Sequence, residues 1–249
     1  MRFPILRGTP SDQLPDVLAT GVTDVRIAFV SMSARQAEGR DEEYMQWHAL
    51  DHCPEQYRLA GLRHSFRVVS TPGCRAARLK DEAPYDRVDH VMTYLFADPA
   101  ALGPFGALSK ALSGERRPLA TPRIQLGAYE LVGKSAAPST VAGADVIPWR
   151  PALGVYLLIE QGRTSSAPLV EVDGIAGVWW LEGGVAGPPF ESDRRGLQLT
   201  YCFLEDDPVA VAERLRRPLA ERWEHKDVEP LLAAPFHMVV PFEWGRHLP

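Results

Sequence analysis

The sequence lacks several features that mark specialised classes of protein. It contains only three cysteines, at 53, 74 and 202, and no CxxC pair, which argues against a disulfide framework or a structural zinc site and favours a reducing compartment. No apolar run approaches the ~20 residues of a membrane span, and the first residues lack a signal-peptide core. No cluster of Lys and Arg marks a nucleic-acid surface. We therefore expect a cytoplasmic protein that binds neither nucleic acid nor a membrane.

What is present is typical of a globular chain. The 249 residues carry a net charge of −5, with 45% hydrophobic and 24% charged residues. Proline is abundant, at 22 residues, against an average usage of about 5%. This composition favours short elements joined by rigid turns.

Two parts of the chain repeat one pattern. A strand-like Thr-Tyr-x-Phe stretch occurs at 93–96 and again at 200–203, and each is followed by an Asp-Pro helix start. Further strand-like segments correspond in the two halves, at 25–32 and 154–161, at 61–70 and 174–183, and at 128–133 and 241–245. Each half thus has the order of a ferredoxin-like βαββαβ unit.

The predicted fold class is α+β, with two ferredoxin-like repeats in one chain. The predicted strands are apolar along most of their length, so each sheet needs a cover on both faces. Helices cover one face, and we expect the two antiparallel sheets to pack into one α/β barrel. The predicted parts are an N-terminal arm at 1–23, repeat 1 at 24–133, a linker at 134–152 and a degenerate repeat 2 at 153–249.

The second half lacks room for one helix. Gly61 and Gly174 are 113 positions apart, as are Tyr129 and Phe242, whereas the residues at 25 and 155 are 130 apart. The second half is thus about 17 residues shorter between its first two strands, which corresponds to one helix of about 25 Å. We expect this helix to be shortened or lost there, together with any site it carries.

The segment 43–55 of the first half carries the most specific motif. It contains an aromatic-Trp pair (Tyr44, Trp47), a His five residues after the Trp (His52) and a Pro-Glu pair, and a Gly-led strand follows. This motif resembles the dimeric α/β-barrel superfamily in its EthD-like branch, here as a tandem repeat covering most of 24–245. The resemblance implies a ferredoxin-like barrel. It also implies that His52 lies over a cavity between helix and sheet.

Several side chains are candidates for such a cavity. We predict His52 as general acid or base, because imidazole titrates near neutral pH. His90 and Tyr94 fall on one strand face and are its predicted catalytic partners. The opposite interpretation makes Tyr94 a core aromatic and His90 an exposed strand end, and Tyr201, the counterpart of Tyr94, favours it. The predicted substrate-binding residues are Trp47 as an apolar wall, Glu55 as an orienting carboxylate, His64, and Arg67 as a carboxylate-holding cation.

A metal site is the competing interpretation of the same helix. His48 and His52 stand four residues apart beside Asp51 and Glu55, as at the edge of a metal site. A divalent metal also needs a third protein ligand and supporting contacts. An exposed His48 beside ion-pairing carboxylates is the simpler interpretation, so we predict no metal.

The sequence predicts a cofactor-independent enzyme that acts on small apolar carbonyl or phenolic metabolites by histidine acid/base chemistry, of the isomerase, cyclase, dehydratase or decarboxylase type. One alternative is a non-catalytic ligand-binding or assembly protein of the EthD-like type, favoured if side chains fill the barrel. The other is a haem-dependent enzyme like chlorite dismutase, whose haem-ligating His lies in the C-terminal repeat. The absence of any His between His90 and His225 argues against haem. Exposed barrel edges could still pair two chains as a homodimer.

Overall fold

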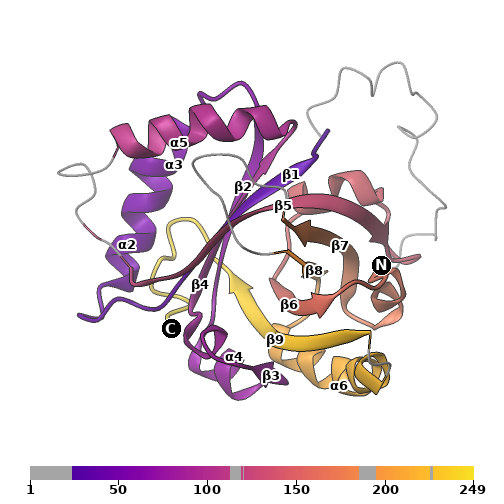
Figure 1. Ribbon diagram of the computed structural model, residues 1–249. Coiled ribbons are helices and arrows are strands. Elements are labelled where there is room, and N and C mark those ends of the chain that lie inside the picture. The colour runs from indigo at the N-terminus through magenta and orange to yellow at the C-terminus, as the bar shows by residue number, and fades with distance from the viewer. Residues whose placement is uncertain (1–23, 113–118, 120, 185–194, 225–226) are drawn as a thin grey trace.

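The structure is a computed structural model that describes residues 24–112, 119, 121–184, 195–224 and 227–249 (Figure 1). The predicted arm at 1–23 and His225 lie outside the described residues. In chain order the elements are β1 (Ile27–Ser33), α2 (Asp41–Trp47), the π-helix η2 (His48–His52), α3 (Cys53–Gln56), β2 (Leu62–Val69), α4 (Pro72–Ala76), β3 (Lys80–Asp81), η3 (Tyr85–Arg87), β4 (His90–Phe96), η4 (Pro99–Ala101), α5 (Leu102–Ala111), β5 (Arg123–Ala136), η6 (Ala144–Trp149), β6 (Gly154–Gly162), η7 (Ala167–Glu171), β7 (Ile175–Gly183), β8 (Leu197–Leu204), α6 (Pro208–Glu224) and β9 (Val228–Met238).

The fold is α+β and is built on one large antiparallel sheet. The strand order is β2-β4-β1-β5-β7-β8-β6-β9-β3, and β2 also pairs with β9. That last pairing joins β2, at one end of the order, to the next-to-last strand, so all strands except β3 form a closed ring of pairings. In the first half the first strand lies between the third and the fourth (β4-β1-β5), and the second half repeats this arrangement (β8-β6-β9).

The two halves differ most between their first and second strands. In the first half α2, η2 and α3 follow one another without a break, from Asp41 to Gln56. At the corresponding place in the second half stands η7, a 3₁₀ turn of five residues. Figure 1 shows α2, α3 and α5 on the outer side of the first-half strands, and α6 on the outer side of β6 and β9. At this place the first half therefore has a continuous helical segment, and the second half has a short turn.

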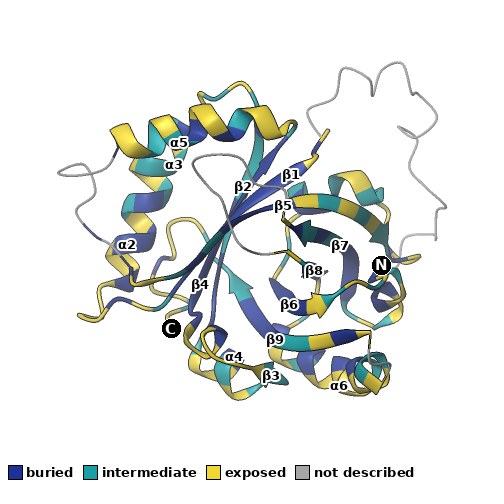
Figure 2. Cartoon of the chain, in the orientation of Figure 1, coloured by how far each residue is buried: buried dark blue, intermediate teal, exposed yellow. Residues whose placement is uncertain are grey.

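Side chains fill the inside of the ring. One cluster of buried apolar residues draws on each of its eight strands, and includes Val30, Phe66, Leu95, Tyr129, Leu157, Trp179, Tyr201 and Phe236. Separate clusters hold α6 and α5 against the outer faces of the sheet. The strands are accordingly buried along most of their length, and exposure is concentrated on the helices (Figure 2). A small molecule would have to bind outside this packed interior.

The matching Thr-Tyr-x-Phe stretches are not equivalent in the structure. Tyr94 lies in the outer cluster beneath α5, whereas Tyr201 lies inside the ring, where its hydroxyl is 2.8 Å from the Thr93 hydroxyl. Because side chains of a strand alternate between faces, an offset of one residue moves a motif to the opposite face. The sequence alignment of the two stretches was wrong by one residue, and Tyr201 is no guide to the role of Tyr94.

The last strand also differs from its prediction. The residues at 241–245, aligned with the strand at 128–133, form turns, and the final strand is β9, which ends at Met238. Two prolines, Pro230 and Pro235, lie within β9. Proline removes a backbone donor and is rare inside a sheet. The two prolines weaken the strand pattern of this segment, so β9, which pairs with β6 along its length, was not predicted from the sequence.

No helix among the described residues is both long and apolar enough to cross a membrane.

Candidate functional site

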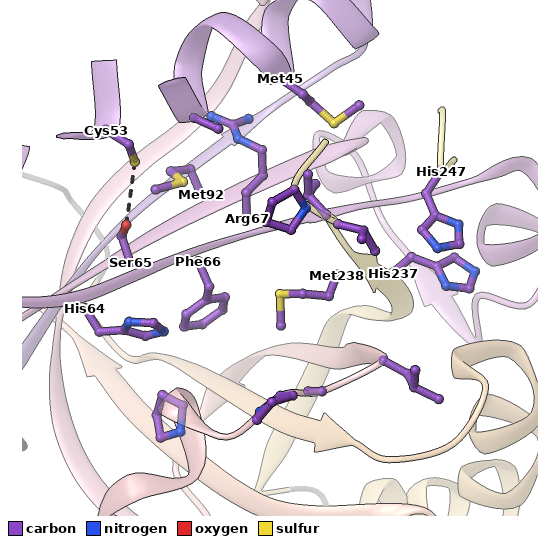
Figure 3. A pocket seen from close by; sticks show the side chains of 18 of the residues that line it. Met45, Cys53, His64, Ser65, Phe66, Arg67, Met92, His237, Met238 and His247 are labelled. Atoms are coloured by element: carbon purple, nitrogen blue, oxygen red, sulfur yellow. Dashed lines mark hydrogen bonds between the residues drawn. The ribbon is translucent and has the colours of Figure 1, made fainter. Parts of the chain in front are cut away.

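A pocket of about 700 Å³ lies beside the junction of β2 and β9 (Figure 3). These strands pair at Val68 with Met238 and at Val69 with His237, and the earlier part of β2 extends past Met238, where β9 ends. The pocket is bounded by the helical segment from α2 to α3, by the segment 148–153 before β6 and by the segment 239–247 after β9. A volume of this size is typical of small-molecule sites. Apolar side chains dominate the lining: Met45, Ala49, Phe66, Met92, Trp149, Leu153, Met238 and Trp244.

The helical wall of the pocket changes register at η2. Met45, His48 and Ala49 face the pocket with α-helical spacing, and the next lining residues are Cys53 and Tyr57. The Cys53 amide donates to the His48 carbonyl, which is the i to i+5 bond of a π turn. Cys53 thus lines the pocket beyond the π turn, and His52 does not. Single π turns of this kind are frequent at functional sites.

A short polar chain connects this wall to β4. The Cys53 thiol donates to the Tyr94 hydroxyl across 3.9 Å, and the Tyr94 oxygen is 3.2 Å from His48 Nε2. Burial raises the pKa of Tyr94 well above its ordinary value of 10, and burial also raises the pKa of Cys53. Both groups therefore keep their protons at neutral pH. His48 can donate from Nε2 to the Tyr94 oxygen, which fixes the orientation of the ring, and His48 is only 7% exposed.

The neighbouring strand β2 supplies the other polar groups. The Ser65 hydroxyl is 3.6 Å from the Cys53 sulfur and 3.0 Å from the Tyr57 hydroxyl (Figure 3). Arg67 donates from Nη2 to the Tyr44 hydroxyl at 3.2 Å, and its guanidinium lies 4.8 Å from the centre of the Tyr44 ring. One wall of a mainly apolar pocket thus carries an imidazole, a thiol, a hydroxyl and a guanidinium.

A buried pair, His90 and Asp41, fixes the start of α2 against β4. His90 Nε2 is 2.7 Å from Asp41 Oδ1, and His90 is fully buried. Burial lowers the pKa of His90 by more than its hydrogen bond to Asp41 raises it. For Asp41, burial raises the pKa, but hydrogen bonds from His90 and from the Gln36 amide outweigh it, so the pKa is lowered. The stable form is a neutral imidazole that donates to a carboxylate.

Replacing His90 by Gln should flatten the pH dependence of stability. The pKa of folded His90 lies below its ordinary 6.5, so the unfolded chain binds this proton more readily, and stability is lost as the pH falls below 6.5. One such proton contributes up to about 1.4 kcal/mol per pH unit. The amide of the introduced glutamine does not titrate but can still donate to Asp41. Urea unfolding of both proteins at pH 7.5, 6.5 and 5.5 measures the slopes, and equal slopes would contradict the neutral-His90 assignment.

The site residues predicted from the sequence lie in different parts of the structure. His90 and Tyr94 do share the helix-facing side of β4, and Arg67 and His64 line the pocket. His64 comes from the opposite face of β2 and lies 5.2 Å from the Trp149 ring. The alternative of an exposed His90 was wrong, because His90 is fully buried beneath Asp41. Asp41 lies 49 positions earlier in the chain, so this contact could not be predicted from local sequence.

Three predicted residues lie on the helix away from the pocket lining. Trp47 and His52 contact each other, with ring centres 5.3 Å apart, and His52 Nε2 is 3.3 Å from Gln56 Nε2. Glu55 pairs with Arg58 at 3.2 Å on the exposed side. The prediction that His48 is exposed was wrong, because the π turn and Tyr94 hold it in the wall.

Sequence reasoning missed Cys53, Ser65 and the segment 239–247 as parts of the pocket. An α-helical reading cannot reveal a π turn, so the shift from His52 to Cys53 had no signal in the spacing. The wall formed by 239–247 depends on where β9 ends. The helical spacing of Met45 and His48 was a signal for this face of the helix, but the Trp47–His52 motif was given more weight.

The residues do not support a bound metal or haem at the places considered from sequence. Among the described residues no group of three or more His, Cys, Asp or Glu side chains is arranged to hold a metal ion. In the second half, the layer between α6 and the sheet is filled by apolar side chains such as Leu158, Val211 and Leu215. This apolar packing leaves no room in that layer for a haem like that of chlorite dismutase, so we derive no step through one.

The sequence matches no protein-family model and no curated protein. Solved structures share the fold at low identity. A provisionally assigned monooxygenase from Fusobacterium nucleatum subsp. nucleatum ATCC 25586 has a TM-score of 0.53 and 8% identity, covering 87% of this chain and 93% of its own. An anthrone oxidase-like protein has a TM-score of 0.51 and 14% identity, covering 88% and 93%. Chlorite dismutase from Candidatus Nitrospira defluvii, in complex with imidazole, has a TM-score of 0.50 and 9% identity, covering 92% and 97%. These similarities show a common ferredoxin-like α+β fold.

Proposed function

We propose that this protein is a cofactor-independent enzyme that moves protons on a small, mostly apolar carbonyl or phenolic metabolite bound in the β2–β9 pocket. The observation that carries the proposal is His48, an imidazole in the pocket wall whose Nε2 is engaged by a tyrosine that keeps its proton. Imidazole is the usual group for proton transfer near neutral pH. The chain would be a tandem of two ferredoxin-like repeats related to the EthD-like branch, with the site only in the first.

In this mechanism Nδ1 of His48 removes a proton from the carbon next to the carbonyl of the bound molecule, in the tautomer whose Nε2–H donates to the Tyr94 oxygen. The charge that develops on the carbonyl oxygen needs a donor or a cation, because an apolar pocket stabilises it poorly. The Ser65 hydroxyl, on the strand facing the helix, is the group placed to donate to this oxygen. Tyr94 acts through His48, because its oxygen accepts from Nε2–H and holds the ring. His52 and His90 remain predictions for this chemistry, and variants of both are included among the tests.

The name of one structural neighbour suggests a probe of fitting chemistry. Anthrone is a flat, mostly apolar tricyclic ketone with an acidic methylene group. Its enolate forms by loss of one methylene proton, and reprotonation in D₂O introduces deuterium at that carbon. The reaction needs no oxidant or cofactor, so it isolates the proposed proton transfer.

The proposal is tested by NMR measurement of deuterium incorporation into anthrone and 2-acetonaphthone in D₂O, with and without the protein. We expect exchange well above that in buffer containing the same concentration of free imidazole. Binding of the ketones without accelerated exchange would reject the enzyme and favour a ligand-binding protein. If the protein neither binds the ketones nor accelerates their exchange, the pocket is rejected as a site for this class of molecule.

A further inference from the structure

The charges that line the pocket are compensated with one exception. Four lining residues carry a full charge. Arg150 pairs with Glu205 at 2.6 Å and Arg246 with Glu243 at 2.9 Å. Asp207 accepts hydrogen bonds from two backbone amides at the start of α6, each at 3.0 Å. Arg67 has no carboxylate within 4.0 Å among the described residues.

The surroundings of Arg67 leave its charge only partly satisfied. Nη2 donates to the Tyr44 hydroxyl and the guanidinium lies over the Tyr44 ring, which together give a modest stabilisation. Its Nε is buried and has no hydrogen-bond partner among the described residues. Figure 3 shows the side chain between Met45 and Met92, two apolar neighbours that contribute nothing to its solvation. A cation held in this way is normally paired.

The position of Arg67 relates it to the proposed catalytic group. The Tyr44 ring beneath the guanidinium is also 6.0 Å, centre to centre, from the His48 ring. Arg67 and His48 therefore belong to one wall, and both adjoin the same apolar space. A ligand whose anionic group is bound by Arg67 would place its carbon skeleton against the apolar lining and near His48.

We infer that the natural ligand is a monoanion, an aromatic molecule bearing a carboxylate whose charge is bound by Arg67. A carboxylate is favoured over a neutral carbonyl because the planar guanidinium donates from two nitrogens to two oxygens. The inference rests on the proposed function, since it names the class of molecule for the same pocket.

The test compares two probes of nearly equal shape, 2-naphthoate and its neutral methyl ester, by calorimetry and saturation-transfer NMR at pH 7.5. The wild type should bind the anion more tightly than the ester. Arg67→Met should lower the affinity for the anion by ~10- to 100-fold, which is the equivalent of losing a charge-assisted hydrogen bond. It should change the affinity for the ester by less than about threefold. The matched variant Arg150→Met removes a compensated lining cation and should change either affinity by less than about threefold.

The outcomes separate this inference from the proposed function. Equal affinity of the wild type for both probes, or an equal loss of both in Arg67→Met, would overturn the anionic class and leave the apolar pocket standing. Binding of neither probe by the folded wild type would reject the pocket and the inference together. A loss of anion binding in Arg150→Met as large as in Arg67→Met would assign the effect to the overall field and overturn the specific role of Arg67.

Discussion

Replacing His48 by Asn is expected to reduce the protein-catalysed deuterium exchange of anthrone by ~100- to 10,000-fold, the usual effect of removing a general acid or base. Asn has no group that takes up a proton in this pH range, but its amide can still hydrogen-bond the Tyr94 hydroxyl. The fold and the affinity for the ketone should therefore change little. NMR exchange rates, together with ligand titrations, separate the loss of chemistry from a loss of binding.

The companion variants distinguish the histidines of the helix. His52→Asn should retain the exchange rate within about threefold, because the π turn directs Cys53 rather than His52 at the pocket. Tyr94→Phe should lower the rate by ~10-fold, since it removes one hydrogen bond to His48 without removing the base. A large loss in His52→Asn with full activity in His48→Asn would contradict our assignment and restore the prediction made from the sequence motif.

Replacing Arg222 by Met should lower the free energy of unfolding by about 3–5 kcal/mol, the cost of leaving a buried charge without its partner. Glu160 in β6 is fully buried, and Arg222 of α6 donates to both of its oxygens, from Nε at 2.8 Å and Nη2 at 2.7 Å. The Trp223 indole donates to the same carboxylate at 2.9 Å. The pair fixes the end of α6 to the sheet, so its loss should be measurable by urea unfolding followed by circular dichroism.

Two further variants make this expectation specific. Arg217→Met breaks the pair of Arg217 with Glu221 on the exposed face of the same helix, and should cost less than about 0.5 kcal/mol. Adding Glu160→Gln to Arg222→Met removes the unpaired charge and should recover part of the loss. A destabilisation by Arg222→Met no larger than that by Arg217→Met would show that water reaches Glu160.

Much of the architecture could be predicted from the sequence because it depends on local patterns. The strands β1, β2, β6 and β7 lie within a few residues of their predicted positions, since apolar runs bounded by glycine determine them. The place of α6 follows from its four-residue apolar spacing and its Asp-Pro start. The difference of 17 positions between the halves corresponds to η7 in place of a longer helix.

The site could be predicted only in part because it depends on register and on long-range contacts. Arg67 and Met92 of β4 line the pocket together with the helix, but His52, which the sequence motif had singled out, does not. The burial of His90 depends on Asp41, and the matching of Tyr94 with Tyr201 failed by a single residue of strand phase. None of these details changes the hydrophobic pattern, so none could be seen in it.

The two junctions between the halves of the ring are of unequal extent. β5 pairs with β7 through seven residue pairs, whereas β2 pairs with β9 through two. Hydrogen-bonded structure opens most readily where it is least extensive, so the β2–β9 junction is the place where the ring opens first. Its opening is resisted by β3, which also pairs with β9, and by the interior cluster that both halves share. The pocket lies at this junction. A molecule bound there contacts both halves and resists their separation, so occupancy of the pocket and cohesion of the whole chain become a single linked equilibrium.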